Sequence, residues 1–321
     1  MQETPYQDSA NPAAPFTFRD FELMHQWTSC TGESLASNPN MKYAMKEVMP
    51  RLAMSQIYLM HSIMAIAALH IAYLRPSEAY AYRLLAAHHE NLALPLIRTA
   101  ITCMNEENCH ALYACGHMVL KYAFASPDSN LVFSDELGVV SEWVTLVRGS
   151  FSVNEFAMKW LSNGPFSSSL EKPVVLDVDL SQNPEDFRFA PLASVLEMHE
   201  GEDVEHCHEA LLILRKLLTM AVAVDPPVTL MTIVYTWPYK ISQRYIELVS
   251  KRIPEALLVL AHYCLLMKKI EDFWYMKGCA ARILHQCQRD LSPEWWSLLD
   301  WPVSAIFDQE INDQSSIGST P

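Results

Sequence analysis

The chain has 321 residues, half of them apolar, which is enough to bury a sizeable hydrophobic core. Its eight glycines are too few to favour β-sandwiches, barrels or α/β folds that hold phosphate in glycine-rich loops. Because DNA affinity depends on Lys and Arg neutralising phosphates, 23 basic against 37 acidic residues, a formal charge of −14, make the chain alone a poor nucleic-acid binder.

The chain divides into one long helical region and two polar ends. Residues 1–19 hold three prolines and little periodicity, so we expect a disordered N-terminal arm. The polar residues 308–321 are expected to form a disordered tail. Between them, the Leu-, Ala- and Met-rich residues 20–307 predict an all-α domain, a single large irregular bundle of about ten helices.

Helices are expected from Asp20 onward. Asp20 is a suitable N-cap, and a helix over 41–49 is predicted to stop at Pro50. The apolar residues 53–74 and the following 77–103 predict two long helices.

The most hydrophobic segment, residues 57–74, is predicted to be a buried core helix. Its longest uninterrupted apolar run, 63–69, is shorter than the about 20 residues that span a bilayer. Residues 1–15 are polar and proline-rich, unlike a signal peptide. We therefore expect a cytoplasmic or nuclear protein that is not secreted and does not span a membrane.

The second half begins with an irregular segment. Helices are predicted over 109–125 and 133–156, and the Pro- and Ser-rich residues 163–191 predict a long crossing without regular structure. A loop of that length inside a domain is often functional. Further helices are predicted at 193–198, 205–224, 229–251, 255–270, 273–289 and near 293–299.

Metal ligation is not favoured by the Cys and His pattern. The cysteines are scattered without a CxxC pair, which is typical of free thiols in a reducing compartment. His206 and His208 lie among acidic residues, but two helical positions apart they point to different faces. We expect a solvated acidic helix start there, and neither a metal nor a cofactor.

Trp143, Arg148 and Gly149 lie on one predicted helix and its end. In the structural interpretation, Gly149 ends the helix in a left-handed conformation and Arg148 compensates its last carbonyls. The alternative is that Arg148 faces a carboxylate or hydroxyl of a ligand.

No nucleophile elbow, P-loop, dinucleotide fingerprint or kinase signature is present. No motif identifies catalytic residues. His117 and His262 are weak candidates for a catalytic acid or base, because burial shifts the pKa of histidine. Chemistry that needs mainly a shaped apolar cavity, such as dehydration or cyclisation, is not excluded.

Aromatic residues in the second half predict an apolar ligand pocket. Helical bundles build such pockets from aromatic and Met side chains, and we expect one between the helices around 235–245 and 273–275 and the crossing at 163–191. Replacing Trp237 or Trp274 with alanine is then expected to weaken ligand binding more than helicity. The candidate ligand-binding residues are Trp143, Arg148, Trp237, Tyr239, Phe273 and Trp274.

Three groups of segments, in order, resemble the effector (ligand-sensing) region of fungal zinc-cluster transcription regulators of the sterol uptake control protein family. The first contains FELMHQW and PRLAMSQIYLMHSIMAIAALHIAYL, and the second contains EWVTLVRGSF and WLSNGPFSSSL. The third joins PEALLVLAHYCLLM, FWYMKGCAARILHQC and WWSLLDWP. Together they span about residues 20–302.

The resemblance implies an all-α domain that binds a hydrophobic sterol- or terpenoid-like molecule. The zinc cluster and basic linker that precede this region in the family are not in the sequence, which points to a fragment of a longer regulator or to a stand-alone descendant. The first hypothesis is a regulatory protein whose helical packing responds to the ligand. The alternative is a biosynthetic enzyme for dehydration or pericyclic cyclisation of an apolar polyketide or terpenoid. A monomer and a homodimer both remain open.

Overall fold

The structure is a computed structural model that describes residues 17–127, 142–167, 170, 174–199, 201–223 and 228–307. These described residues form helices and connecting segments with no β-strand among them, so the predicted all-α class is confirmed. The labels run to α14 because π-helical turns divide single helical stretches. Residues 1–16 of the predicted arm and the predicted tail at 308–321 lie outside the described residues.

Two helical stretches open the chain, and both differ from the prediction. The first starts at Phe18: Thr17 is the N-cap, and Asp20 completes a capping box from the third helical position. In the second, Pro50 does not stop the helix, because the preceding turn widens into a π-helix and frees the proline ring from the usual carbonyl clash. The elements are α1 (Phe18–Gln26), η1 (Trp27–Thr31), α2 (Gly32–Ser34), α3 (Pro39–Tyr43), η2 (Ala44–Val48) and α4 (Met49–Ala53).

The helix α5 (Ile57–Leu74) is the core of the N-terminal half. It is long and apolar enough to cross a membrane, but 78% of it is buried among other helices, which accounts for its apolar character. It packs against α6 (Ala79–Thr102) and α7 (Cys109–Ala125). Its buried His61 contacts His89 Nδ1 to Nδ1 at 3.1 Å, and His89 Nε2 lies 3.1 Å from an Asp20 carboxylate oxygen.

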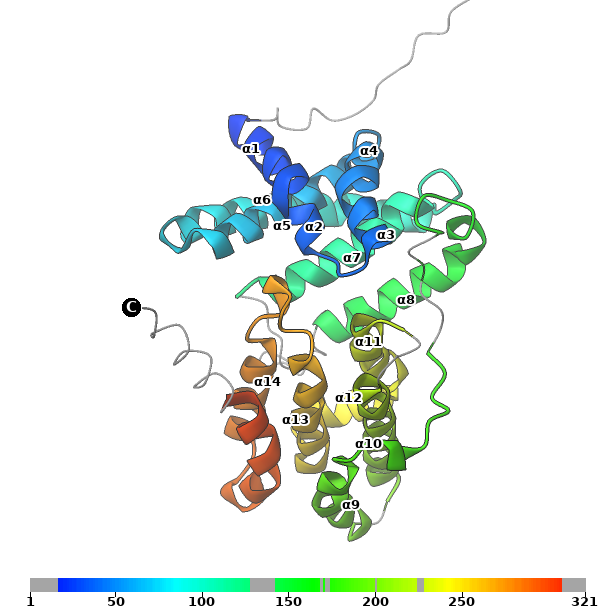
Figure 1. The fold of residues 1–321 in the computed structure, drawn as a ribbon, viewed down its shortest axis with the longest axis vertical. Helices are drawn as coiled ribbons and strands as arrows, with labels where there is room; N and C mark the ends of the chain where they lie inside the picture. The colour runs from blue at the N-terminus through cyan, green and yellow to red at the C-terminus, as the bar shows by residue number, and fades with distance from the viewer. Residues whose placement is uncertain are drawn as a thin grey trace, which may run out of the picture.

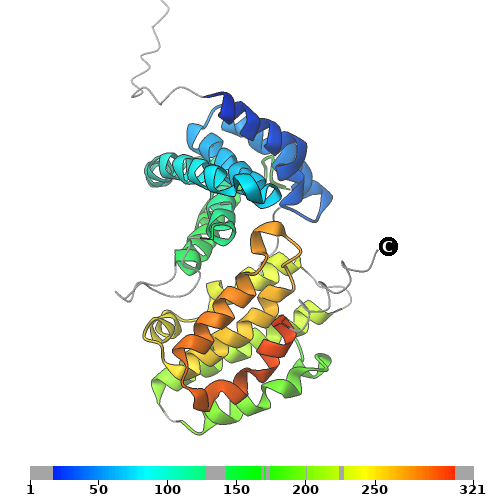
Figure 2. The same ribbon diagram turned by 90° about the vertical axis from the view of Figure 1, so that its left-hand side faces the viewer.

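The C-terminal half is a second group of helices. Figures 1 and 2 show it below the α1–α7 group, with α8 (Glu142–Leu161) along the boundary, in contact with both α7 and α11. Its elements are α9 (Ala190–Glu197), α10 (Glu202–Val222), α11 (Leu230–Lys240), α12 (Gln243–Ser250), α13 (Pro254–Lys268), η7 (Trp274–Met276), α14 (Cys279–Asp290), η8 (Pro293–Leu299) and a last helix at 300–307.

Two predicted long helices are each broken in this half. The helix expected over 229–251 divides into α11 and α12, because the side chain of Ser242 caps a new helix by accepting from the Tyr245 N–H. The helix expected over 273–289 divides at Gly278, whose φ of 74° is a left-handed conformation that favours glycine. The described parts of the 163–191 crossing contain only short 3₁₀ turns, η5 (Leu180–Gln182) and η6 (Asp186–Phe189), before α9 begins.

Candidate functional site

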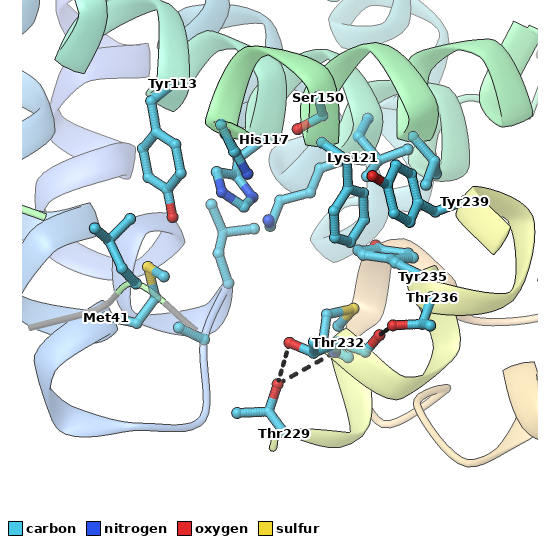
Figure 3. A pocket seen from close by; sticks show the side chains of 18 of the residues that line it. Met41, Tyr113, His117, Lys121, Ser150, Thr229, Thr232, Tyr235, Thr236 and Tyr239 are labelled. Carbon is cyan, nitrogen blue, oxygen red and sulfur yellow. Dashed lines mark hydrogen bonds between the residues drawn. The ribbon is translucent and has the colours of Figure 1, made fainter. Parts of the chain in front are cut away.

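A cavity of about 260 Å³ lies where the two halves meet. Its walls come from α7 and α8, from α11, from the turn between α2 and α3, and from the segment around η7. Figure 3 shows side chains of α7 and α11 directed into this space from opposite sides. The chamber therefore contacts segments that are far apart in the sequence.

Helix α7 presents one face to the cavity. Tyr113, His117 and Lys121 are spaced four residues apart, which places them along one side of the helix, and all three line the cavity. Gly116 allows α8 to approach α7 closely, because a Cβ atom at this position would lie 3.2 Å from the hydroxyl of Ser150. Ser150 also lines the cavity.

The walls of the cavity are largely apolar and aromatic. Phe151 of α8 stacks on Tyr239 of α11 with ring centroids 4.5 Å apart, and Phe273 and Met41 close other sides. The threonine hydroxyls on α11 are bonded within their own helix: Thr229 accepts from the backbone N–H of Thr232, and Thr236 donates to the Thr232 carbonyl at 2.7 Å. They leave an oily surface with few polar points.

Lys121 is a buried cation in this surface. Its residue is 5% exposed, and no carboxylate of the described residues lies within ion-pair distance of its ammonium. The Nζ atom lies 5.4 Å from the ring centroid of Tyr275, and Figure 3 shows it directed into the cavity beside His117. Burial, which disfavours the charged form, lowers the pKa of Lys121 to about 8.

His117 is neutral at physiological pH. Burial first, and then the neighbouring Lys121, lower its pKa to about 3. Its Nε2 atom is buried without a hydrogen-bond partner in the described structure. The Oδ1 atom of Asn154 and the hydroxyl of Tyr275, which also line the cavity, are buried and unpartnered in the same way. The cavity thus combines apolar walls with unused hydrogen-bonding groups and one cation.

Of the candidate ligand-binding residues, Tyr239 and Phe273 line the cavity. The guanidinium of Arg148 instead donates to the Pro238 carbonyl at 2.9 Å and to the Ile241 carbonyl, at the C-terminal end of α11. The sequence interpretation gave Arg148 the last carbonyls of its own helix, but α8 continues through Gly149 to Leu161. Arg148 therefore compensates the end of a neighbouring helix.

The two tryptophans of the second half lie away from the cavity. Trp237 is 1% exposed, stacks on Tyr263 at 4.3 Å and donates to the Ala210 carbonyl at 2.9 Å, because its side of α11 faces α10 and α13. Trp274 stacks on His70 at 4.5 Å and donates to the Ser34 hydroxyl, which ties η7 to the N-terminal half. Neither residue is placed to contact a guest in the cavity.

The remaining candidates separate as follows. His117 lines the cavity, whereas His262 is buried between Phe189 and Trp301, and burial lowers its pKa to about 4. The side chain of Trp143 lies outside the described part of the structure. Within the described ranges, no group of three or more His, Cys, Asp or Glu side chains is placed to hold a metal ion.

The sequence reasoning did not identify Lys121 or Asn154, and it included Tyr275 only in the aromatic segment 273–275 beside the expected pocket, without naming it as a ligand-binding residue. A signal for Lys121 was present, because it is the single charged residue in the apolar segment CHALYACGHMVLKYAFA and follows His117 by one helical turn. For Asn154 and Tyr275 the deciding feature is the absence of a partner, which depends on tertiary packing.

Comparisons with known proteins relate the chain to fungal transcription regulators. Residues 22–159 match the family described as the fungal specific transcription factor domain. The chain is 23% identical, over 88% of its length, to a Zn(2)-C6 fungal-type transcription factor of Gibberella zeae, and spans 61% of that relative. It is 26% identical to the Zn(2)-C6 fungal-type transcription factor afumD of Aspergillus fumigatus, over 82% of this chain and 71% of the relative. These descriptions do not name sterol uptake control proteins, so that narrower resemblance stays a prediction.

Proposed function

From the homology to Zn(2)-C6 fungal-type transcription factors, we propose that this chain is the effector region of such a regulator and binds a mainly apolar small molecule in the cavity. The observation that carries the proposal is the position of the cavity between the two helical halves. A guest there contacts α7 and α8, which belong to the matched family region, and also α11 and Phe273, which follow it.

This position provides a physical route from binding to regulation. A ligand shifts a conformational equilibrium by the difference in its affinity for the two states. A guest in the cavity would contact both halves at once. It would therefore stabilise the arrangement in which α8 packs against α11, relative to one in which the two helices are apart. The contacts that α8 makes with α7 and α11 are the packing that such a guest would bias.

The size of the cavity narrows the class of guest. Ligand sites commonly measure roughly 300–1,000 Å³, and this cavity measures about 260 Å³. A compact terpenoid- or polyketide-sized molecule therefore suits it better than a complete sterol, which requires the lining side chains to move. With a formal charge of −14, the chain itself binds DNA poorly. In this proposal, a partner or another segment provides the DNA contact and the nuclear location that goes with it.

The test is a fluorescence titration with N-phenyl-1-naphthylamine, a neutral apolar probe that brightens in a dry pocket. The wild-type chain is expected to bind it saturably with one site. Val147→Phe adds a ring to a residue that lines the cavity and is expected to abolish binding while circular dichroism shows a folded protein.

A matched control is Val144→Phe, one helical turn away on α8 at a buried position that does not line the cavity. Overpacking there costs about 1–3 kcal/mol of stability, yet binding is expected to persist. Absence of saturable binding by the wild-type chain, or equal binding by Val147→Phe, rejects the proposal. The biosynthetic alternative stays a prediction from the sequence. It is tested by incubating the wild-type chain with apolar polyketide or terpenoid intermediates and analysing the products.

A further inference from the structure

Lys121 carries a buried ammonium group for which the described residues provide no counter-charge. Transferring an ammonium from water to an apolar interior is costly unless a counter-charge or several hydrogen bonds compensate it. The sequence contains 37 acidic residues, but none in the described structure forms an ion pair with this lysine. Its neighbour His117 is neutral, and the ring of Tyr275 offers only a weak cation–π contact at 5.4 Å.

The Lys121 side chain points into the cavity, so a guest bound there is in position to supply the missing counter-charge. Lys121 lies on the α7 face that lines the chamber, and its ammonium is directed inward in Figure 3. The unpartnered hydroxyl of Tyr275 and the unpartnered Nε2 of His117 line the same chamber. A hydroxyl and a neutral imidazole are both able to bind oxygen atoms of a guest.

The remaining lining restricts what such a guest is. Phe151, Tyr239 and Phe273 offer apolar surface, so a small inorganic anion would leave most of the chamber unfilled. Glu155 and Lys240, the other charged lining residues, are exposed at the edge and remain solvated. The interior therefore has one cationic point on an apolar wall.

We propose that the natural ligand of this cavity is an amphipathic carboxylic acid, with its carboxylate bound to Lys121 and its apolar body held by Phe151, Tyr239 and Phe273. The inference deepens the proposed function and rests on it, because it specifies the chemical class of the sensed molecule. An ion pair formed in this dry interior is charge-assisted and stronger than one in water.

The test compares geranic acid with geraniol, which share one terpenoid body and differ in the head group. Both displace N-phenyl-1-naphthylamine from the wild-type chain at pH 7, and the acid is expected to bind about tenfold or more tightly. Acetate, which has the carboxylate without the body, is expected to fail at comparable concentrations.

Lys121→Met removes the charge and preserves the apolar stem. This variant is expected to lose the preference for geranic acid while its affinity for geraniol stays within about twofold of wild type. Lys240→Met, which removes the exposed cation at the edge of the same cavity, is the matched control and is expected to keep the preference. Circular dichroism confirms that each variant is folded.

The outcomes separate this inference from the proposed function. Equal binding of acid and alcohol by the wild-type chain, or an unchanged preference in Lys121→Met, overturns the acidic ligand and leaves an apolar effector site intact. Binding of N-phenyl-1-naphthylamine without binding of geranic acid has the same meaning. Failure of all three probes overturns both proposals. Loss of acid preference in Lys121→Met alone supports the inference.

Discussion

Two interior regions on either side of α11 differ in whether their buried polar side chains have hydrogen-bond partners. In the core around α13, the Trp237 indole donates to the Ala210 carbonyl, the Tyr245 hydroxyl to Ala256 and the Tyr263 hydroxyl to Val234. In the cavity, the Nε2 atom of His117 and the hydroxyl of Tyr275 are buried without a hydrogen-bond partner, and the buried Lys121 forms no ion pair with a carboxylate of the described residues. One helix thus separates a satisfied interior from an unsatisfied one.

The contrast indicates which part of the interior is complete without a bound guest. Nearly all buried polar groups in proteins have hydrogen-bond partners, and each exception carries a cost in stability. The α13 core obeys this rule although it is rich in Tyr and Trp. Of the six buried side-chain atoms without a hydrogen-bond partner in the described structure, three line this one chamber, on His117, Asn154 and Tyr275, where a bound guest is able to supply the missing partners.

The largest expected effect separates the two regions by stability. Trp237→Ala creates a large void in the α13 core and leaves the Ala210 carbonyl without its indole donor, so we expect a loss of about 3–5 kcal/mol in the free energy of unfolding. Tyr239→Ala, on the cavity side of the same helix, is half-buried and is expected to cost less stability but to weaken binding of N-phenyl-1-naphthylamine more. Urea denaturation and probe titration measure both quantities. Equal stability losses would contradict the distinction.

The next effect has the opposite sign. Burial lowers the pKa of Lys121 from its ordinary 10.5 to about 8, which corresponds to a cost of about 3 kcal/mol when the group is charged in the folded protein. Lys121→Met is therefore expected to raise the free energy of unfolding at pH 7 by up to that amount, in the absence of ligand. A destabilised variant would show that the ammonium is satisfied within the protein.

The pH dependence of that difference follows from proton linkage. Below about pH 8 the lysine is charged in both states and its full cost is present. Between about 8 and 10.5 the unfolded chain binds more protons, so wild-type stability rises relative to Lys121→Met, and above this window the cost is gone. The difference isolates Lys121, because the two proteins share the other titratable groups that line the cavity: Tyr113, His117, Glu155, Tyr235, Tyr239, Lys240 and Tyr275.

The fold was predictable from sequence to the extent that periodicity determines it. The apolar segment at 57–74 was predicted to be a buried helix and α5 has those bounds, although the apolar stretch from which the helix was expected began at Ala53, which ends α4 instead. The breaks were harder to predict: the π-helical turn before Pro50 and the αL residue Gly278 depend on local geometry that composition does not reveal.

The pocket was anticipated at the level of elements more than of residues. Tyr235, Trp237 and Tyr239 belong to one helix, α11, but they lie on different faces of it: Tyr235 and Tyr239 line the cavity, while Trp237 is packed against Tyr263. Positions two apart on a helix face different directions, so composition alone could not assign them. Arg148 was equally ambiguous, since its acceptors come from a helix about ninety residues later, Pro238 and Ile241.

The smallest expected effect is the most direct comparison, because it removes one hydroxyl from each region. Tyr263 and Tyr275 are both fully buried, but only the first donates to a carbonyl, that of Val234 at 3.1 Å. That carbonyl depends on the tyrosine, since Pro238, four residues later in α11, has no N–H to offer it. Tyr263→Phe is therefore expected to cost about 1–1.5 kcal/mol.

Tyr275→Phe is expected to leave the free energy of unfolding unchanged within about 0.5 kcal/mol, or to raise it, because the buried hydroxyl that it removes has no partner to lose. Paired urea denaturation curves with equal slopes measure the difference. In a titration with geranic acid, Tyr275→Phe is expected to bind more weakly than Tyr263→Phe. Tyr275→Phe loses a hydroxyl that lines the cavity, whereas Tyr263→Phe keeps every lining residue. A larger stability loss in Tyr275→Phe than in Tyr263→Phe would mean that the cavity's polar groups are satisfied without a ligand, and the contrast between the two interiors would not hold.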